Sequence, residues 1–290
     1  MNTKAKHTPS FQPKRYLGLE LAGAKNEKTA VAALEFYPRE KKIFLLDIFD
    51  KAVAHDDQSG DEALLEIIDE LKPGVAAMGV NVPLTLPPCI TCHRKACSLP
   101  LGCSQPAVKW MHDFSRKIAK NQKEKKSKIK PFTPYTQRPV ELWIRHQILP
   151  ELSESSRFDI DEALGGTKAP LTARMVYLKR HLNDFKLIEA WPKLTVALLA
   201  QENEISRRTI SSYRHLEEGI HARTEIIESL ADHLGIFIYE RDLRKLSRSL
   251  AAFDAFMCAY TALLSDSGDC ESAPAGFPEE SGWVEYPSRA

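Results

Sequence analysis

The sequence predicts an α/β protein with a mixed sheet: three antiparallel strands, then parallel strands with helices on both faces. Apolar runs at 16–21, 29–36 and 43–49 are separated by short polar turns, which is typical of an antiparallel meander. An amphipathic helix at 59–71 follows. The next run, 75–82, is continuously apolar, as strands of parallel sheets often are.

The turns and the first helix carry their own signals. Gly23 begins the first turn and Pro38 begins the second. Ser59 and Glu62 have the spacing of a capping box at the start of the helix. The apolar residues of that helix form a single stripe, made of Ala63, Leu64, Ile67, Ile68 and Leu71.

The rest of the chain alternates a long interruption with helical patterns. Residues 83–105 are rich in Pro and Cys, and a lysine-rich run follows at 117–130. Prolines open four of the expected helices, at Pro106, Pro139 (to residue 149), Pro170 (171–183) and Pro192. Further helices are expected at 220–234 and 250–264, a strand at 185–190 and a small closing strand at 282–287. We therefore expect a disordered leader at 1–14 and one domain at 15–290 with an insertion at 83–150.

The composition of the chain indicates the cellular compartment of the protein more clearly than its function. The chain has 290 residues and a formal charge of +1, so nucleic-acid binding would need a local basic patch. No apolar stretch approaches the roughly 20 residues of a membrane span. The polar N-terminus lacks the apolar segment of a signal peptide. These features predict a cytoplasmic protein, in which the six cysteines stay reduced.

Two carboxylates fall at the ends of expected strands. Glu20 ends the first strand on the face opposite its leucines, just before a glycine turn. Glu189 lies near the end of the strand at 185–190, where ligands of α/β sheets gather. Ordinary structural roles are also open: Glu20 as a salt-bridged or edge-exposed side chain, and Glu189 as a carboxylate that favours a helix start.

Asp254 lies in the middle of a helix whose neighbouring positions are almost all apolar. A carboxylate in such a face costs several kcal/mol unless a cation or a donor meets it. Alanines at 251, 252, 255 and 259 thin the helix, so that it can approach a sheet closely. The alternative to a functional role is an ion pair with an arginine. We predict that Glu20, Glu189 and Asp254 converge on Mg²⁺ or Mn²⁺, which take oxygen ligands and can serve phosphodiester cleavage.

The chain resembles the domain-of-unknown-function family 429, described as predicted nucleases with a ribonuclease-H-like fold. The matching segments lie between Tyr16 and Pro287, and their order and spacing carry the resemblance. They read GLELAGAKNEKTAVAALE, VNVPLTLPPC, PYTQRPVELWIR, IEAWP, FDAFMCAYTALL and GWVEYP.

The resemblance implies a ribonuclease-H-like fold and an acidic, metal-dependent site at Glu20, Asn81, Glu189 and Asp254. The family usually has Asp at the positions of Glu20 and Asn81. Related resolvases often add an Asp one helical turn before the last one, where this chain has Ala251. The acidic site is therefore reduced compared with the family pattern.

Four cysteines fall in the insertion with the spacing C-x2-C-x4-C-x5-C, namely Cys89, Cys92, Cys97 and Cys103. Four thiolates can close a tetrahedral Zn²⁺ site, which would hold together a long loop with little apolar content. An iron–sulfur cluster and four unligated thiols are the alternatives. We predict zinc.

The segment after the cysteines is basic and aromatic. Lys125 and Lys126 lie in the run at 117–130, and Tyr135 and Arg138 follow in a short proline-bounded turn. Lysines neutralise phosphates and aromatic rings stack on bases, so these four residues are the candidates for substrate binding. The alternative is a solvated loop.

These features predict a metal-dependent nuclease, with no indication of its substrate or oligomeric state. The alternative is an inactive nucleic-acid-binding or scaffold protein that keeps the fold. A sugar-kinase or actin-like fold would need a second meander and a second phosphate loop, for which only Gly165, Gly166 and Thr167 offer a sign.

Overall fold

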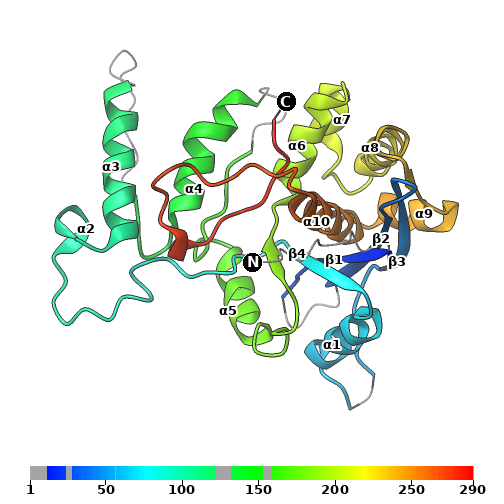
Figure 1. The fold of residues 1–290 in the computed structure, drawn as a ribbon, viewed down its shortest axis with the longest axis horizontal. Helices are drawn as coiled ribbons and strands as arrows, with labels where there is room; N and C mark the ends of the chain where they lie inside the picture. Colours follow the sequence, from blue (N-terminus) through cyan, green and yellow to red (C-terminus); the bar gives the residue numbers. More distant parts are fainter. Residues whose placement is uncertain (1–11, 24–27, 56, 122–131, 153–157, 290) are drawn as a thin grey trace, which may run out of the picture.

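The computed structural model describes residues 12–23, 28–55, 57–121, 132–152 and 158–289. A six-stranded mixed sheet forms its centre, in the order β5-β4-β1-β2-β3-β6 (Figure 1). The strands are β1 (Lys14–Glu20), β2 (Ala30–Tyr37), β3 (Lys42–Phe49), β4 (Val75–Val80), β5 (Leu187–Glu189) and β6 (Ile236–Phe237).

The strand directions confirm the predicted fold class. β1, β2 and β3 are antiparallel neighbours, β4 pairs in parallel with β1, and β5 pairs in parallel with β4. This arrangement is the ribonuclease-H-like topology. The sheet also contains β6, a two-residue strand parallel to β3 that the sequence did not suggest.

Helices cover both faces of the sheet. On one face, α1 (Gly60–Leu71) and α5 (Lys168–Leu178) pack on the leucines of β1. The other face buries α6 (Pro192–Glu202), α8 (Glu218–Leu234) and α10 (Leu250–Ser267), with α7 (Arg207–Ser212) and α9 (Glu240–Arg248) beside them. The predicted capping box of α1 is present, because Ser59 accepts from the Glu62 amide and Glu62 from the Ser59 amide.

The insertion leaves the sheet and returns to it. It contains the short α2 (Leu99–Gly102) and the long α3 (Pro106–Asn121), which stands apart from the sheet in Figure 1. The buried face of α3, including Met111 and Phe114, packs on Leu142 of α4 (Pro139–Trp143). The α4 segment continues as a π-helical turn, Ile144–Ile148, and a 3-10 turn, Leu149–Glu151, where the sequence predicted one regular helix.

Two terminal predictions need correction. Lys14 belongs to β1 rather than to a leader, and residues 1–11 lie outside the described ranges. In place of a closing strand at 282–287, two isolated bridges join Glu285 to Ala190 and Pro287 to Cys270. Across the described ranges, no helix has both the length and the apolar character needed to cross a membrane.

The backbone of helix α10 packs directly against the backbone of the central strands. A Cβ atom placed on Gly18 of β1 would lie 1.9 Å from the Ala255 carbonyl oxygen, and one on Gly79 of β4 would lie 2.1 Å from that of Cys258. Alanines on the helix, including Ala255 and Ala259, are fully buried in this contact. The thin helix predicted from its alanines is confirmed.

We predict that Gly18→Ala destabilises the fold by about 3 kcal/mol or more, at the upper end of overpacking effects, because the added methyl group meets helix backbone that cannot move aside. The matched control is Gly23→Ala, where an added Cβ has nothing within 4 Å. Urea denaturation of both variants measures the difference. Equal stability of the two would show that α10 can move away from the sheet.

Candidate functional site

The predicted site residues gather at the carboxyl ends of three neighbouring strands. Glu20 is the last residue of β1, Asn81 directly follows β4, and Glu189 is the last residue of β5. β4 lies between the other two strands and is parallel to both, so the three ends meet at one edge of the sheet. Ligands of α/β sheets bind at such an edge.

Glu20 and Asn81 are in direct contact. The Asn81 amide nitrogen donates to a Glu20 carboxylate oxygen over 2.6 Å. The Lys168 ammonium, on the first residue of α5, donates to the main-chain and side-chain oxygens of Asn81 at 3.0 and 3.3 Å. Asn81 therefore links the acidic group on β1 to a cation on α5.

Asp254 is buried in the second turn of α10 and has an arginine partner. The Arg214 guanidinium lies 3.1 and 3.0 Å from its two carboxylate oxygens. Arg214 follows α7 in the chain, and its side chain is 32% exposed, whereas that of Asp254 is 2% exposed. The ion pair considered as the alternative for Asp254 is thus present.

Glu20 and Asp254 influence each other. The pKa of Glu20 is raised to about 7: burial raises it most and the nearby Asp254 carboxylate adds to the rise, while Lys168, Asn81 and Arg214 lower it. Burial also raises the pKa of Asp254, although Arg214 opposes this shift. The surrounding cations therefore leave the two carboxyl groups incompletely compensated.

Glu189 belongs to a different cluster. Both of its carboxylate oxygens accept from the Arg138 guanidinium, at 2.6 and 2.8 Å, and one also accepts from the Leu84 amide. The Arg138 Nε donates to Glu141 at 2.8 Å, and the Arg138 backbone amide donates to the other Glu141 oxygen. One arginine thus joins two buried carboxylates, and burial raises the pKa of Glu141 to about 7.

This geometry contradicts the prediction of one cation shared by three carboxylates. Glu189 is held by Arg138, and Asp254 by Arg214. In the part of the chain that the structure describes, no three His, Cys, Asp or Glu side chains are placed to hold a metal ion. The oxygen donors left at the edge are Glu20, Asp254 and the Asn81 side chain. Among these groups, Asn81 presents its amide nitrogen to Glu20 and its side-chain oxygen to Lys168.

The candidates for substrate binding separate in the structure. Arg138 is 2% exposed and serves the buried cluster, so its predicted contact with phosphate is wrong. Tyr135 is 54% exposed and accessible to a ligand. Lys125 and Lys126 lie outside the described residues.

The site includes cations that the sequence analysis missed. Lys168 follows the Gly165–Gly166 turn, which was considered only as a phosphate loop. Lys193 is the second residue of α6, and Arg214 lies in a short polar stretch with no motif. The contact between Glu141 and Arg138 could have been predicted from the sequence, because Glu141 lies three residues after Arg138 at the start of a helix that opens with proline.

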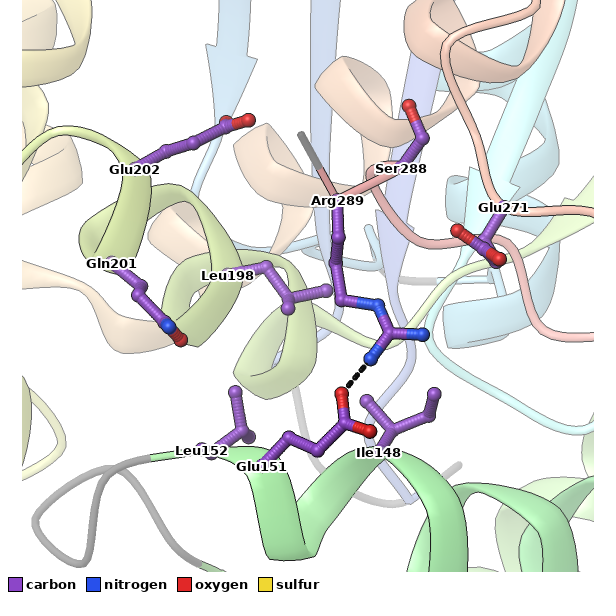
Figure 2. Close-up of a pocket in the computed structure, with 9 residues that line it drawn as sticks. All are labelled: Ile148, Glu151, Leu152, Leu198, Gln201, Glu202, Glu271, Ser288 and Arg289. Carbon is purple, nitrogen blue, oxygen red and sulfur yellow. Dashed lines mark hydrogen bonds and ion pairs between the residues drawn. The ribbon is translucent and has the colours of Figure 1, made fainter.

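Of two cavities in the structure, one borders this edge of the sheet and the other does not. A small cavity of about 30 Å³ is bordered by Asn81, Lys168, Asp161, Trp191 and the Arg138 cluster. A larger one of about 580 Å³ contains none of the predicted residues, and Figure 2 shows Arg289 reaching across it to Glu151. Its lining consists of Ile148, Glu151, Leu152, Leu198, Gln201, Glu202, Glu271, Ser288 and Arg289. Cavity size alone therefore does not mark the site.

The four insertion cysteines are free thiols. Cys92 and Cys97 are exposed, and Cys89 and Cys103 are partly buried. Burial raises the pKa of Cys89, and the other three thiols raise it further, so each of them lies within electrostatic range of Cys89. They are near each other without the closed geometry of a metal site.

Comparisons of the chain with protein-family models, with curated proteins and with solved structures find no match. The resemblance to family 429 therefore stays a prediction from the motifs.

We predict that Arg138→Met destabilises the protein by about 3–5 kcal/mol, because it leaves Glu141 and Glu189 buried without their common cation. The control is Tyr135→Ala, an exposed position nearby, which should stay within about 0.5 kcal/mol of the wild type. Urea denaturation measures both. If Arg138→Met kept wild-type stability, the buried cluster would have no structural role.

We predict that Glu20 makes the protein less stable as the pH rises. Its pKa is about 7 in the folded chain against a usual 4.5, so the folded state holds the proton more tightly and loses stability as pH rises between these values. Glu20→Gln should remove about 1–3 kcal/mol of this loss, a pKa unit being worth about 1.4 kcal/mol.

The measurement is urea denaturation across this pH range with a chelator present. Glu40→Gln, in the exposed turn between β2 and β3, is the matched control and should follow the wild type. A pH profile of Glu20→Gln identical to that of the wild type would contradict the raised pKa.

Proposed function

We propose that this protein is a divalent-metal-dependent nuclease that hydrolyses phosphodiester bonds at the edge formed by Glu20, Asn81 and Asp254. One observation carries the proposal: the partly buried Glu20 carboxyl group and the buried Asp254 carboxyl group repel each other at the carboxyl end of the central strand, where the Asn81 amide nitrogen donates to Glu20. Protein cations only partly offset their charge, and a divalent cation would offset the remainder. The ribonuclease-H-like fold is consistent with this activity, although fold alone does not establish function.

The resemblance to family 429 supports the same proposal through position. Its quoted segments supply Glu20, Asn81, the Arg138 cluster and Asp254, which converge at one edge of the sheet. Residues related only by chance similarity would not be expected to meet there. We therefore propose membership of that family.

In the proposed reaction Glu20 and Asp254 would hold one Mg²⁺ or Mn²⁺, and the Asn81 side-chain oxygen would join them after its amide group turned from Lys168 towards the cation. When bound, the cation would neutralise negative charge at the reacting phosphate. Lys168 holds the Asn81 side chain in place through its hydrogen bond to the amide oxygen. Arg138 fixes Glu189 and the insertion at the rim, a positioning role rather than a catalytic one.

The second candidate is a nucleic-acid-binding protein without cleavage. The Arg214–Asp254 ion pair and the neutral Asn81 favour it, because both reduce the negative charge available to a cation. In that case the exposed Tyr135 and the lysine-rich run at 117–130 would still be available to contact nucleic acid. Cleavage separates the two candidates.

We predict Mg²⁺- or Mn²⁺-dependent cleavage by the full chain of single-stranded, duplex or branched nucleic acid. Asp254→Asn should lower the rate about 100-fold or more, since even second-shell partners of a metal are worth about 10–100-fold. Asn81→Asp should increase metal affinity by adding a carboxylate. Glu40→Gln should leave cleavage unchanged. Absence of cleavage with intact nucleic-acid binding would favour the second candidate.

We also propose that Cys89, Cys92, Cys97 and Cys103 bind Zn²⁺. Four thiolates are the donor set of a structural zinc site, and three of these thiols lie within electrostatic range of Cys89. The loop around them has little core of its own, since Ile90, Leu99 and Leu101 are exposed. A bound metal would hold this loop together, and its formation would draw the exposed Cys92 and Cys97 towards Cys89.

We predict about one zinc per chain when the protein is purified without metal-affinity steps, as a four-cysteine site requires. Cys92→Ser should release the metal, and Cys270→Ser, outside the insertion, should retain it. Elemental analysis and thiol titration provide the readout. If the protein contained iron and absorbed visible light as an iron–sulfur cluster does, the site would hold such a cluster instead of zinc. If all four thiols were reactive and no metal were present, both alternatives would be excluded.

A further inference from the structure

We propose that Lys168, Lys193 and Arg214 form a phosphate-binding subsite, and that Arg214 couples this subsite to the cation site by exchanging Asp254 for phosphate. The inference deepens the proposed function by naming the group that binds beside the metal. It rests on that function for the identity of the edge as a nuclease site. The coupling itself is a binding property and can be measured without cleavage.

Lys193 is the first observation behind this subsite. It is the second residue of α6. Burial lowers the pKa of its ammonium group, as do Arg214 and Lys168, whereas Asp161 and Asp254 raise it. The Lys193 nitrogen lies 6.0 Å from the centroid of the Phe158 ring. No hydrogen bond or ion pair to the Lys193 ammonium is found within the described ranges. A partly buried ammonium group that lacks such a partner is stabilised when an anion binds beside it.

The three cations come from separate elements and converge on one edge. Lys168 opens α5, Lys193 lies in the first turn of α6, and Arg214 follows α7. Each is near enough to Asp254 to shift the pKa of its carboxyl group. An anion that reached all three would therefore lie beside Glu20 and Asp254.

Charge balance links the subsite to the metal. The three cations face three carboxyl groups, Glu20, Asp161 and Asp254. When these six groups are all ionised their charges cancel, so a divalent cation alone leaves the six groups with an excess of positive charge and a phosphate alone leaves an excess of negative charge. Binding of both restores the balance, and by linkage each ligand must increase the affinity of the other equally.

Arg214 is the side chain able to carry out the exchange. It is 32% exposed, so its guanidinium can turn from Asp254 without opening the core. Guanidinium groups bind phosphate oxygens through the same paired geometry that they use for carboxylates. Departure of Arg214 would free Asp254 for the cation. The Arg214–Asp254 ion pair would therefore keep Asp254 from binding the cation until phosphate binds Arg214.

The test measures Mg²⁺ binding to the full chain by calorimetry, with and without inorganic phosphate. We expect phosphate to tighten Mg²⁺ binding about 5-fold or more, the lower range of typical coupling between sites. Arg214→Gln should bind Mg²⁺ more tightly than the wild type in the absence of phosphate and should lose the phosphate effect. Lys193→Met should weaken the phosphate effect without weakening Mg²⁺ binding alone.

The matched control is Arg244→Gln, on the exposed surface of α9, which should behave as the wild type. If Arg214→Gln does not fold, Arg214→Lys, which keeps the charge but replaces the planar guanidinium with a single ammonium nitrogen, should show reduced coupling. The inference is overturned if phosphate leaves Mg²⁺ affinity unchanged in the wild type, if no Mg²⁺ binds, or if Arg214→Gln keeps full coupling.

A short single-stranded oligonucleotide in place of phosphate distinguishes the sources of the anion. Equal or stronger coupling with the oligonucleotide supports nucleic acid as the ligand. Coupling with free phosphate alone supports the subsite but overturns nucleic acid as its source. Coupling without cleavage would overturn the proposed nuclease activity and leave the subsite standing, so the two failures are separable.

Discussion

The contact between α10 and the central strands sets the geometry on which the rest of the site depends. Gly18 and Gly79 let the helix backbone touch β1 and β4, and the alanines of α10 make the same approach possible from the other side. Asp254 lies one residue before Ala255, which meets Gly18. A bulkier contact would move Asp254 away from Glu20 and remove the repulsion between them. Close packing and carboxylate chemistry are thus consequences of the same small residues.

A second buried interaction ties the insertion to the sheet. Arg138 precedes α4 and binds Glu141 in its own helix and Glu189 at the end of β5. Such a cluster stabilises little when complete, because desolvation offsets most of the attraction, but it is costly to break. Its value lies in position: it fixes the start of α4 against the strand end beside Asn81. The helices α3 and α4 therefore stand at a defined place relative to the candidate site.

The charges at the edge explain how a reduced acidic site can persist in a folded chain. Two carboxyl groups in a poorly solvated place would be expensive if both were ionised and unpaired. Asn81 donates to Glu20, Arg214 pairs with Asp254, and Glu20 can hold a proton near neutral pH. The same partners would lower the affinity of the proposed cation site, so stability of the chain and metal binding would be opposed. A ligand that draws Arg214 away would relieve that opposition.

The sequence alone determined the meander, the capped α1, the buried β4 and the thin α10, because each rests on local periodicity, turn residues or residue size. It also brought Glu20, Asn81 and Glu189 to one edge, since parallel strands share an edge at their carboxyl ends. Only the tertiary structure decided the partners of these groups. Arg138 lies 51 residues from Glu189 and Arg214 lies 40 from Asp254, and neither pairing follows a periodic pattern. Ion pairs between distant segments depend on where whole elements pack, which no local signal in the sequence records.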